Sequence, residues 1–386
     1  MTHFHFLSPR ARLALLRDPY DLEGSSPLFL QAVRENIRWH QRRCPGYRQI
    51  LQARGFCPDA VRTEEDLWRI PVLPTLYLKR HPLLSIPKEQ IRWIATSSGT
   101  GGAKTRVAFD TSSLACLGAM GRRLLSCHGV FSPVPALYLI LGYEPFRGVS
   151  AGAIQTAFGA TFTAPAAGRV YALKRNGLGG WDINLKGLLD ALSSWKQGGP
   201  RLPLRLVGFP SYLYFLARCL KEKKIRLPSH PLSCVLMSGG WKGFAQMEPS
   251  PEVLCSLIGE VFHIPRERIF EFFCASEHNV LYRRCPQGHF HVPAYSRVII
   301  RDPVTMEPLP PGQTGLLSFV FPLITSMPLI SVMTDDMAVL LDSSGKGGCG
   351  CGLKTPAFDL AGRAASQAIK TCAAQAAELW EGGMKR

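Results

Sequence analysis

The chain has 386 residues, of which 46% are hydrophobic, and a mean hydropathy of +0.04, which excludes a disordered protein and predicts one large or two closely joined domains. Its formal net charge of +17 suits an anionic ligand or partner. The basic residues are scattered, however, and no nucleic-acid-binding signature accompanies them, which argues against a nucleic acid partner.

Twelve cysteines, without a charged-then-apolar leader at the start of the chain, predict a reducing compartment, and we expect a cytoplasmic protein. Residues 315–333 contain no charged residue and are nearly long enough to span a membrane. Pro322, Pro328 and four Ser/Thr residues interrupt this stretch. We therefore predict two buried strands joined by a proline-containing turn, and no transmembrane segment.

In chain order, the hydrophobic pattern predicts an α/β fold. The first clear helix is expected over residues 27–43, with Ser25 and Ser26 as caps. After it, helical patterns are expected at 112–127, 151–158, 182–196, 212–223 and 251–262. Short apolar runs alternate with these helices at 136–142, 204–208, 233–237 and 268–273. Such alternation is typical of largely parallel, buried sheets.

From about Val280 onward the pattern changes to hairpins. Strands are expected at 296–301, 315–321 and 331–341, divided by Pro/Gly turns. A glycine-rich stretch at 343–352 then leads to a final helix near 366–380.

The stretch Thr96–Thr105 is a candidate phosphate-binding loop. It combines hydroxyls, glycines and a lysine directly after the strand-like run 90–95, and such residues supply close backbone N–H groups and a positive charge. A polar turn between two strands is the alternative. Walker and dinucleotide-binding patterns are excluded, because they require glycine where Ala103, Ser98 or Lys104 stands.

This stretch instead resembles the Ser-Gly-Thr-x-Gly-x-x-Lys loop of acyl-adenylate-forming enzymes, which wraps the phosphates of ATP. The resemblance implies nucleotide contacts from Thr96, Ser97, Ser98, Gly99, Thr100, Gly101 and Lys104.

Two further motifs follow predicted strands. Ser238-Gly239-Gly240-Trp241-Lys242 lies at a strand's carboxyl end, where open α/β sheets bind ligands, and resembles the Ser-Gly-Gly turn that these enzymes place against adenine. A plain strand-to-helix turn is the alternative. Ser276-Glu277 resembles the end of their Tyr-Gly-x-Thr-Glu motif, which implies a hydroxyl contact to nucleotide from Ser276 and a magnesium ligand in Glu277. A surface glutamate is the alternative for Glu277, and it is the interpretation that the residue favours when taken in isolation.

Thr334-Asp335-Asp336 resembles the Thr-Gly-Asp motif, whose aspartate binds both ribose hydroxyls, so Asp336 is the expected ribose ligand. Asp335 stands where that motif has glycine, and the sequence leaves open which carboxylate points inward. Gly362-Arg363 resembles the Gly-Arg step that ends the large domain, which implies that Arg363 lies near ribose or phosphate.

These motifs occur in the order that adenylate-forming enzymes share. Four segments narrow the resemblance to the acyl-protein synthetases of the bacterial luminescence fatty acid reductase system, the long-chain-fatty-acid luciferin-component ligases: Gly239–Lys242, Glu277–Val280, His291–Pro293 and Arg301–Thr305. The likeness runs from about Cys44 to Cys372.

The resemblance implies the large N-terminal α/β domain of these enzymes, with mixed and parallel sheets, over residues 1–363. A β-rich subdomain is expected at about 280–360 and a short helical tail at 364–386. Since only this tail follows Arg363, the C-terminal lid domain is expected to be absent or much reduced.

The implied activity is ATP- and Mg²⁺-dependent activation of a fatty or aryl acid to acyl-AMP, followed by acyl transfer to a thiol. Lys104, Glu277 and Cys372 are the expected catalytic residues, Cys372 as an acyl carrier whose thiolate Lys370 favours. Cys372 as a small apolar residue on an Ala-rich helix is the alternative. An acyl reductase or a carrier protein is the implied partner. A ligase that acylates CoA or a carrier protein, and a non-catalytic nucleotide-binding partner, remain as alternative functions.

Cys285, His291, Cys349 and Cys351 form a candidate structural zinc site, with His289 as a competitor of His291. Phenylacetate-ligase-like enzymes carry a similar set, and unliganded thiols are the alternative.

Gly148-Val-Ser150-Ala-Gly152 matches the nucleophile elbow of serine hydrolases. Glu144-Pro145-Phe146-Arg147 intervene after the preceding apolar run, whereas an elbow follows its strand without a gap. A serine hydrolase is therefore a remote alternative.

Overall fold

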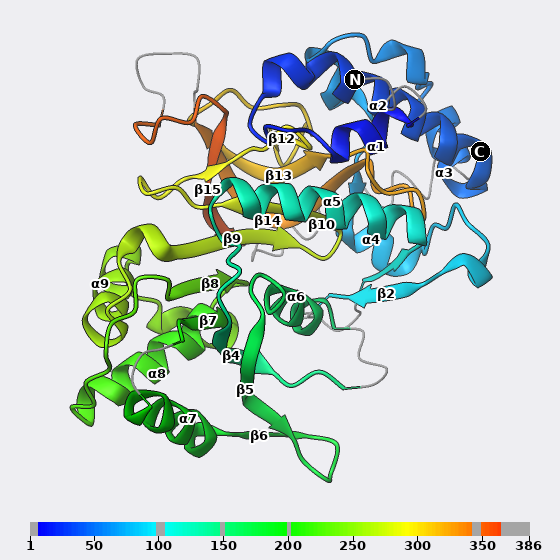
Figure 1. The fold of residues 1–386 in the computed structure, drawn as a ribbon. Coiled ribbons are helices and arrows are strands. Elements are labelled where there is room, and N and C mark those ends of the chain that lie inside the picture. Colours follow the sequence, from blue (N-terminus) through cyan, green and yellow to red (C-terminus); the bar gives the residue numbers. More distant parts are fainter. Residues whose placement is uncertain (1–6, 98–104, 147–150, 199–201, 342–348, 364–386) are drawn as a thin grey trace. The chain divides into compact units, whose positions relative to one another are not determined.

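The computed structural model describes residues 7–97, 105–146, 151–198, 202–341 and 349–363. Contacts within the chain divide it into two compact units. Unit 1 comprises residues 1–128, 275–282 and 289–386, and unit 2 comprises residues 129–274 and 283–288. Figure 1 shows the elements of both units.

Unit 1 is built on an antiparallel sheet in which strands follow the order β11-β15-β14-β13-β12, and β1 pairs in parallel with β14. The strands are β1 (Leu73–Pro74), β11 (Phe290–His291), β12 (Arg297–Arg301), β13 (Thr314–Val320), β14 (Ser331–Leu341) and β15 (Ala357–Arg363). Strand β10 (His278–Arg283) begins in this unit. Its helices are α1 (Pro9–Ala14), α2 (Leu22–Arg43), α3 (Pro45–Ala53), α4 (Thr75–Arg80) and α5 (Thr111–Cys127).

Helix α2 begins earlier than the sequence predicted. The carboxylate of Asp21 accepts a hydrogen bond from the Gly24 amide and caps the helix, so the predicted caps Ser25 and Ser26 lie inside it. Proline at position 27 had suggested a later start, but the helix continues through it.

Unit 2 is a largely parallel sheet with helices packed on it. Its strands follow the order β9-β8-β7-β4-β5-β6, and only β6 runs antiparallel to its neighbour. They are β4 (Ala136–Tyr143), β5 (Ala166–Arg175), β6 (Trp181–Ile183), β7 (Leu204–Gly208), β8 (Cys234–Ser238) and β9 (Ile269–Ala275). The helices are α6 (Gly152–Ala160), α7 (Leu185–Gln197), α8 (Pro210–Glu222) and α9 (Pro251–Phe262).

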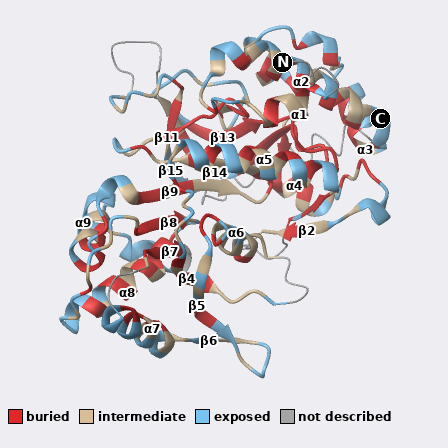
Figure 2. Ribbon diagram, viewed as in Figure 1, coloured by how far each residue is buried: buried red, intermediate tan, exposed pale blue. Residues whose placement is uncertain are grey.

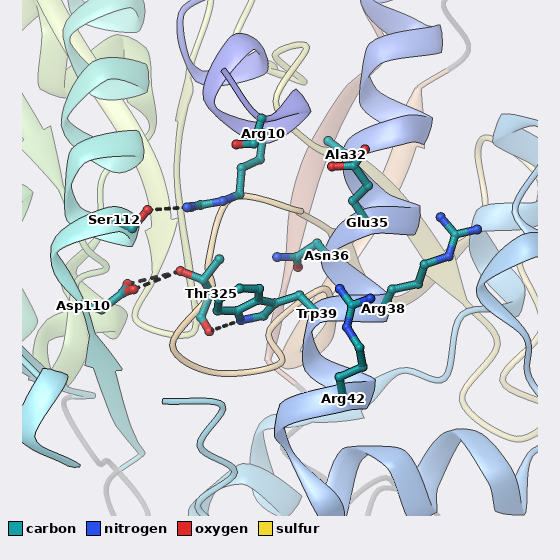
Figure 3. Close-up of a pocket in the computed structure, with 11 residues that line it drawn as sticks. Arg10, Ala32, Glu35, Asn36, Arg38, Trp39, Arg42, Asp110, Ser112 and Thr325 are labelled. Carbon is teal, nitrogen blue, oxygen red and sulfur yellow. Dashed lines mark hydrogen bonds between the residues drawn. The ribbon is translucent and has the colours of Figure 1, made fainter. Parts of the chain in front are cut away.

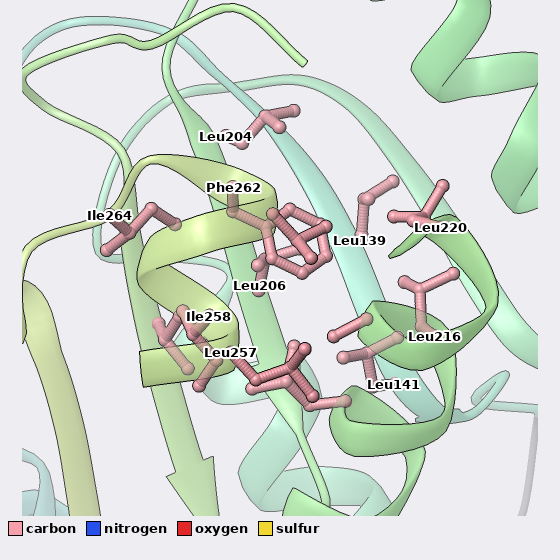
Figure 4. Packing of buried hydrophobic residues seen from close by; sticks show 14 of the residues in the cluster. Leu139, Leu141, Leu204, Leu206, Leu216, Leu220, Leu257, Ile258, Phe262 and Ile264 are labelled. Carbon is pink, nitrogen blue, oxygen red and sulfur yellow. The ribbon is translucent and has the colours of Figure 1, made fainter. Parts of the chain in front are cut away.

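One face of this sheet carries the hydrophobic core of unit 2. Alternate residues of β4 and β7, including Leu139, Leu141 and Leu206, meet apolar side chains of α8 and α9 such as Leu216 and Ile258 (Figure 4). Apolar side chains recur about every 3.6 residues in the helices and every two residues in the strands, and both sets meet in this one layer. For this reason the alternation of helical patterns and apolar runs in the sequence predicted these helices and strands correctly.

The apolar stretch 315–333 contains β13 and the start of β14, which are buried neighbours in the antiparallel sheet, as predicted. No helix among the described residues is long and apolar enough to cross a membrane.

Candidate functional site

The predicted phosphate loop joins two antiparallel strands of unit 1, β2 (Trp93–Thr96) and β3 (Arg106–Phe109). Ser97 and Thr105 close its base, because the Thr105 amide donates to the Ser97 hydroxyl at 3.0 Å and the Ser97 amide donates to the Thr105 carbonyl at 3.0 Å. Thr96 pairs with Arg106 in the ladder. The remaining predicted loop ligands, Ser98, Gly99, Thr100, Gly101 and Lys104, lie outside the described residues.

Glu277 lies in the turn before β10 and is only 6% exposed. Burial raises the pKa of its carboxyl group, and the hydroxyl of Thr105 and the ammonium of Lys79 partly oppose this rise. A buried carboxylate with a hydroxyl and an ammonium group beside it is a set of groups that can bind a hard cation and a phosphate oxygen.

The next residue, His278, anchors this turn in the core. Its ring stacks on Phe319 with centroids 4.0 Å apart, and its Nε2 lies 2.6 Å from the hydroxyl of Tyr282. Burial lowers the pKa of His278 to about 3, so the imidazole is neutral and acts in packing and hydrogen bonding. Ser276, the predicted nucleotide contact, lies in the same turn, where its carbonyl accepts a hydrogen bond from Asn279.

Asp336 and Arg363 lie opposite each other on β14 and β15, and the Arg363 Nε donates to Asp336 Oδ1 at 3.2 Å. Burial raises the pKa of Asp336, and the positive charge of Arg363 partly opposes the rise. The structure therefore brings together the two residues that the sequence had assigned to ribose and phosphate.

A β-bulge produces this pairing. Met337 pairs with Gly362, but Ala338 pairs with Leu360, so Ala361 is the extra residue on β15. Gly362 has φ +106°, a conformation that glycine adopts without steric cost. The bulge thus places Arg363 opposite Asp336.

The structure also distinguishes the two adjacent carboxylates. Successive residues of a strand point to opposite faces, and Asp335 turns toward α4, where Lys79 Nζ lies 3.9 Å from it and the Thr75 hydroxyl donates to it at 3.4 Å. The Asp335 side chain is 55% exposed, against 18% for Asp336. Asp336 is therefore the more enclosed of the two carboxylates.

Lys79 was not predicted from the sequence and Thr105 was assigned no role, although both lower the pKa of Glu277. Thr105 is the last residue of the glycine-rich stretch, so its position beside the motif could have marked it. Lys79 lies in an ordinary helix, and no local pattern marks it.

In unit 2, Ser238 is the last residue of β8, and Gly239 and Gly240 follow it, so the motif lies at the carboxyl end of a strand, as predicted. Gly239 has φ +82°, and a Cβ added there would lie 3.0 Å from the ring of Phe209. The glycine thus allows an aromatic ring to lie against the main chain. Lys242 begins the short 3₁₀-helix Lys242–Met247, and its side chain lies outside what the structure describes.

Phe209 belongs to a row of aromatic rings at the carboxyl ends of β4, β7 and β8. Successive ring centroids lie 4.9 to 6.4 Å apart along the series Trp181, Tyr143, Phe209, Tyr212, Phe244 and Phe215. Burial raises the pKa of Tyr212 to about 12, so this row stays uncharged at neutral pH.

The predicted zinc ligands also converge. One ligand atom from each of Cys285, His291, Cys349 and Cys351 lies within 4.8 Å of the others. Cys351 Sγ is 3.2 Å from His291 Nε2, close to the roughly 3.5 Å expected between sulfur and nitrogen around tetrahedral zinc. His291 Nδ1 lies 3.1 Å from the Thr355 carbonyl, which orients Nε2 toward the cysteines.

The competing ligand His289 has a different partner. Its Nδ1 lies 2.9 Å from the carboxylate of Asp359, so the structure favours His291 over His289 as the ligand.

A pocket of about 420 Å³ lies elsewhere in unit 1 (Figure 3). Across it, the Thr325 hydroxyl donates to Asp110 at 3.1 Å and the Trp39 indole donates to the Thr325 carbonyl at 2.9 Å. None of the sequence-predicted site residues lines this pocket.

Ser150 and Cys372, the candidate nucleophiles, lie outside the described residues.

The family model for the acyl-protein synthetase LuxE matches residues 11–380, nearly the whole chain. The chain belongs to this acyl-protein synthetase family. Among its curated relatives, the long-chain-fatty-acid–luciferin-component ligase of Vibrio harveyi is 24% identical over 327 residues, covering 84% of this chain and 82% of the relative. The phenylacetate-coenzyme A ligase of Thermus thermophilus is 24% identical over 328 residues, covering 83% of this chain and 66% of the relative.

Among solved structures, 2-hydroxyisobutyryl-CoA ligase in the postadenylation state, in complex with 2-HIB-AMP, has a TM-score of 0.65 and 18% identity to this acyl-protein synthetase family member. The match covers 90% of this chain and 69% of that one, and it shows the fold. The predicted acyl-protein synthetase family, with its ligase activity, and the mixed α/β fold are therefore confirmed.

Proposed function

We propose that the chain activates a fatty or aryl carboxylic acid with ATP and transfers the acyl group to a thiol. Besides membership of the family, one observation carries the proposal: Glu277 is 6% exposed and the Asp336 side chain is 18% exposed, and burial raises the pKa of both carboxyl groups, which the sequence assigned to metal and ribose. Burying a carboxylate is unfavourable, so two such groups beside cationic side chains indicate a functional site.

In this proposal Asp336 accepts hydrogen bonds from the ribose hydroxyls, and Arg363 holds Asp336 in place and contacts a ribose or phosphate oxygen. The loop backbone with Ser97, Ser98, Thr100 and Lys104 binds the phosphates, and Glu277 is the protein ligand of Mg²⁺. When bound, Mg²⁺ would neutralise phosphate charge. Ser238, Gly239 and Gly240 form a flat surface for adenine.

The reaction needs little covalent help from the protein. A carboxylate oxygen of the acid attacks the α-phosphorus of ATP, the bond to the leaving oxygen breaks, and pyrophosphate leaves with that electron pair. The side chains position the two reactants and stabilise the charge that develops on the phosphates. The aromatic row of unit 2 supports an apolar acid, because its uncharged rings offer dispersion contacts to an acyl or aryl group.

Acid-dependent exchange between pyrophosphate and ATP tests the adenylation step. A panel of fatty and aryl acids should support exchange with at least one member. Exchange with none of them, although the protein binds ATP, would identify a non-catalytic nucleotide-binding protein instead.

Cys372 is proposed as the acyl carrier. After incubation with ATP and a labelled acid, the wild-type chain should retain the label through denaturation, and neutral hydroxylamine should release it. Cys372→Ser should lose the label and keep pyrophosphate exchange, because the thiol acts after adenylation. Cys57→Ser, at an exposed cysteine, is the matched control. Failure of the wild-type chain to retain the label would favour direct transfer to CoA or a carrier protein, and label retained by Cys372→Ser would assign the acyl group to another residue.

We also propose structural zinc at Cys285, His291, Cys349 and Cys351. About one equivalent is expected in untreated protein, and Cys351→Ser or His291→Ala should lose it and unfold at a lower temperature. His289→Ala should keep the metal, because His289 pairs with Asp359. Metal analysis that finds less than about a tenth of an equivalent would contradict this proposal.

A further inference from the structure

The β5–β6 hairpin of unit 2 exposes apolar side chains that its own unit does not cover. Leu178, in the turn, is 97% exposed, and Ile183, at the end of β6, is 81% exposed. In Figure 2 the end of the hairpin beyond the buried part of β5 is exposed. Two large apolar side chains exposed to this degree within six residues are unfavourable in water, and they indicate a surface that binds something.

The turn presents Leu178 on an ordered scaffold. The side-chain oxygen of Asn176 accepts hydrogen bonds from the amides of Leu178 at 3.2 Å and Gly180 at 2.7 Å, and the Asn176 amide donates to the Gly180 carbonyl at 3.0 Å. The Asn176 side chain also donates to Asp182 at 3.0 Å. Because this turn is already hydrogen-bonded, contact through Leu178 would require little further ordering.

Positive charge surrounds these apolar residues. Between Ala166 and Lys186 the chain carries four basic residues and one acidic residue, a net charge of +3. Lys174, Arg175 and Lys186 are exposed, and the single acid, Asp182, is the one that accepts the Asn176 hydrogen bond. Trp181 lies between Leu178 and Ile183 and is partly exposed.

We infer that this hairpin docks on an anionic lipid bilayer, with Leu178 and Ile183 inserted at the level of the headgroups and the basic side chains on lipid phosphates. Exposed Leu and Ile, a Trp and flanking Lys and Arg form the composition that binds bilayer interfaces. A five-residue turn with a short edge strand is too small for a stable protein–protein interface, which buries about 800 Å² on each partner. Docking would place the protein where a long-chain acid concentrates, but the inference does not rest on the proposed function.

Co-sedimentation of the full chain with vesicles, without acid or nucleotide, tests the inference. We expect binding to phosphatidylcholine vesicles that contain phosphatidylglycerol, and weaker binding to phosphatidylcholine alone or at high salt. Leu178→Asp/Ile183→Asp should weaken partitioning at least about tenfold, and Lys174→Glu/Lys186→Glu should remove the preference for anionic vesicles. Val304→Asp, at a residue 80% exposed in unit 1, is the matched control and should bind as wild type.

Three results would overturn the inference. The first is failure of the wild-type chain to sediment with anionic vesicles, and the second is sedimentation of the Leu178→Asp/Ile183→Asp variant to the same extent as wild type. The third is self-association in sedimentation velocity that the same double variant abolishes, which would assign the hairpin to a second copy of the chain. All substituted side chains are exposed, so each variant should fold, and thermal unfolding checks this.

Discussion

Glu277→Gln is expected to reduce pyrophosphate exchange by about 100-fold or more while leaving the protein at least as stable as wild type near neutral pH. Glutamine keeps the shape of the side chain and removes the charge proposed to bind Mg²⁺. Exchange assays and thermal unfolding of the same preparation measure both effects. An inactive but stable variant would show that Glu277 serves the reaction and not the fold.

The stability effect follows from the sign of the pKa shift. Burial raises the pKa of Glu277 above its ordinary value of 4.5, so the folded state favours the protonated form. The stabilisation from that form is fully present below the unfolded-state pKa and is lost as pH rises through the folded-state pKa. At neutral pH the wild-type carboxylate is therefore unfavourable and glutamine is not, and the difference should vanish in acid.

Activity should also depend on the ionisation of Glu277, but it should rise with pH, whereas the stabilisation by the protonated form falls. If the charged carboxylate binds the metal, wild-type exchange should fall on acidification at a pH above that of an ordinary glutamate. Glu271→Gln is the matched control, because burial also raises the pKa of Glu271 and no site motif includes it. Loss of exchange in Glu271→Gln as large as in Glu277→Gln would attribute both losses to a general effect of buried carboxylates.

Asp336→Asn is expected to raise the KM for ATP about 10- to 100-fold, since each hydrogen bond to a charged group contributes about 1.5 to 3 kcal/mol. Steady-state exchange at varied ATP concentrations measures it. Asp335→Asn provides the matched control on the neighbouring residue, which pairs with Lys79 and Thr75 on α4 and is expected to change the KM little. A larger effect at Asp335 than at Asp336 would reverse the assignment of the ribose ligand.

The sequence predicted the parts of the fold in which hydrophobic periodicity is strong. The bounds of α9, β7 and β14 agree with the predictions, since α9 has buried residues at helical spacing, β7 is a continuous buried run and β14 begins with four buried residues. Strand β5 was missed because its first half contains alanines and a glycine and is only partly buried, so it lacks an apolar run. Strand β6 was merged into the helix that follows it, since three residues carry no period.

For the candidate site, too, the sequence predicted some residues and left other choices open. Motif order predicted Glu277, Asp336 and Arg363 as candidates, because the chemistry of nucleotide binding restricts those residue types. The choices between Asp335 and Asp336, and between His289 and His291, required coordinates. His289 and His291 lie two residues apart, a spacing that in a strand would put both on the same face, so the sequence does not separate them, whereas the contacts with Asp359 and Thr355 do.

Because of the bulge at Ala361, the ion pair between Asp336 and Arg363 depends on one backbone torsion angle, the φ of residue 362. In a regular ladder Gly362 would stand opposite Asp336, and Arg363 would point to the other face of the sheet. A β-branched residue at 362 would disfavour the observed φ of +106° and so favour that slipped register. Residue 362 carries no charge, but its conformation therefore determines whether Arg363 can pair with Asp336.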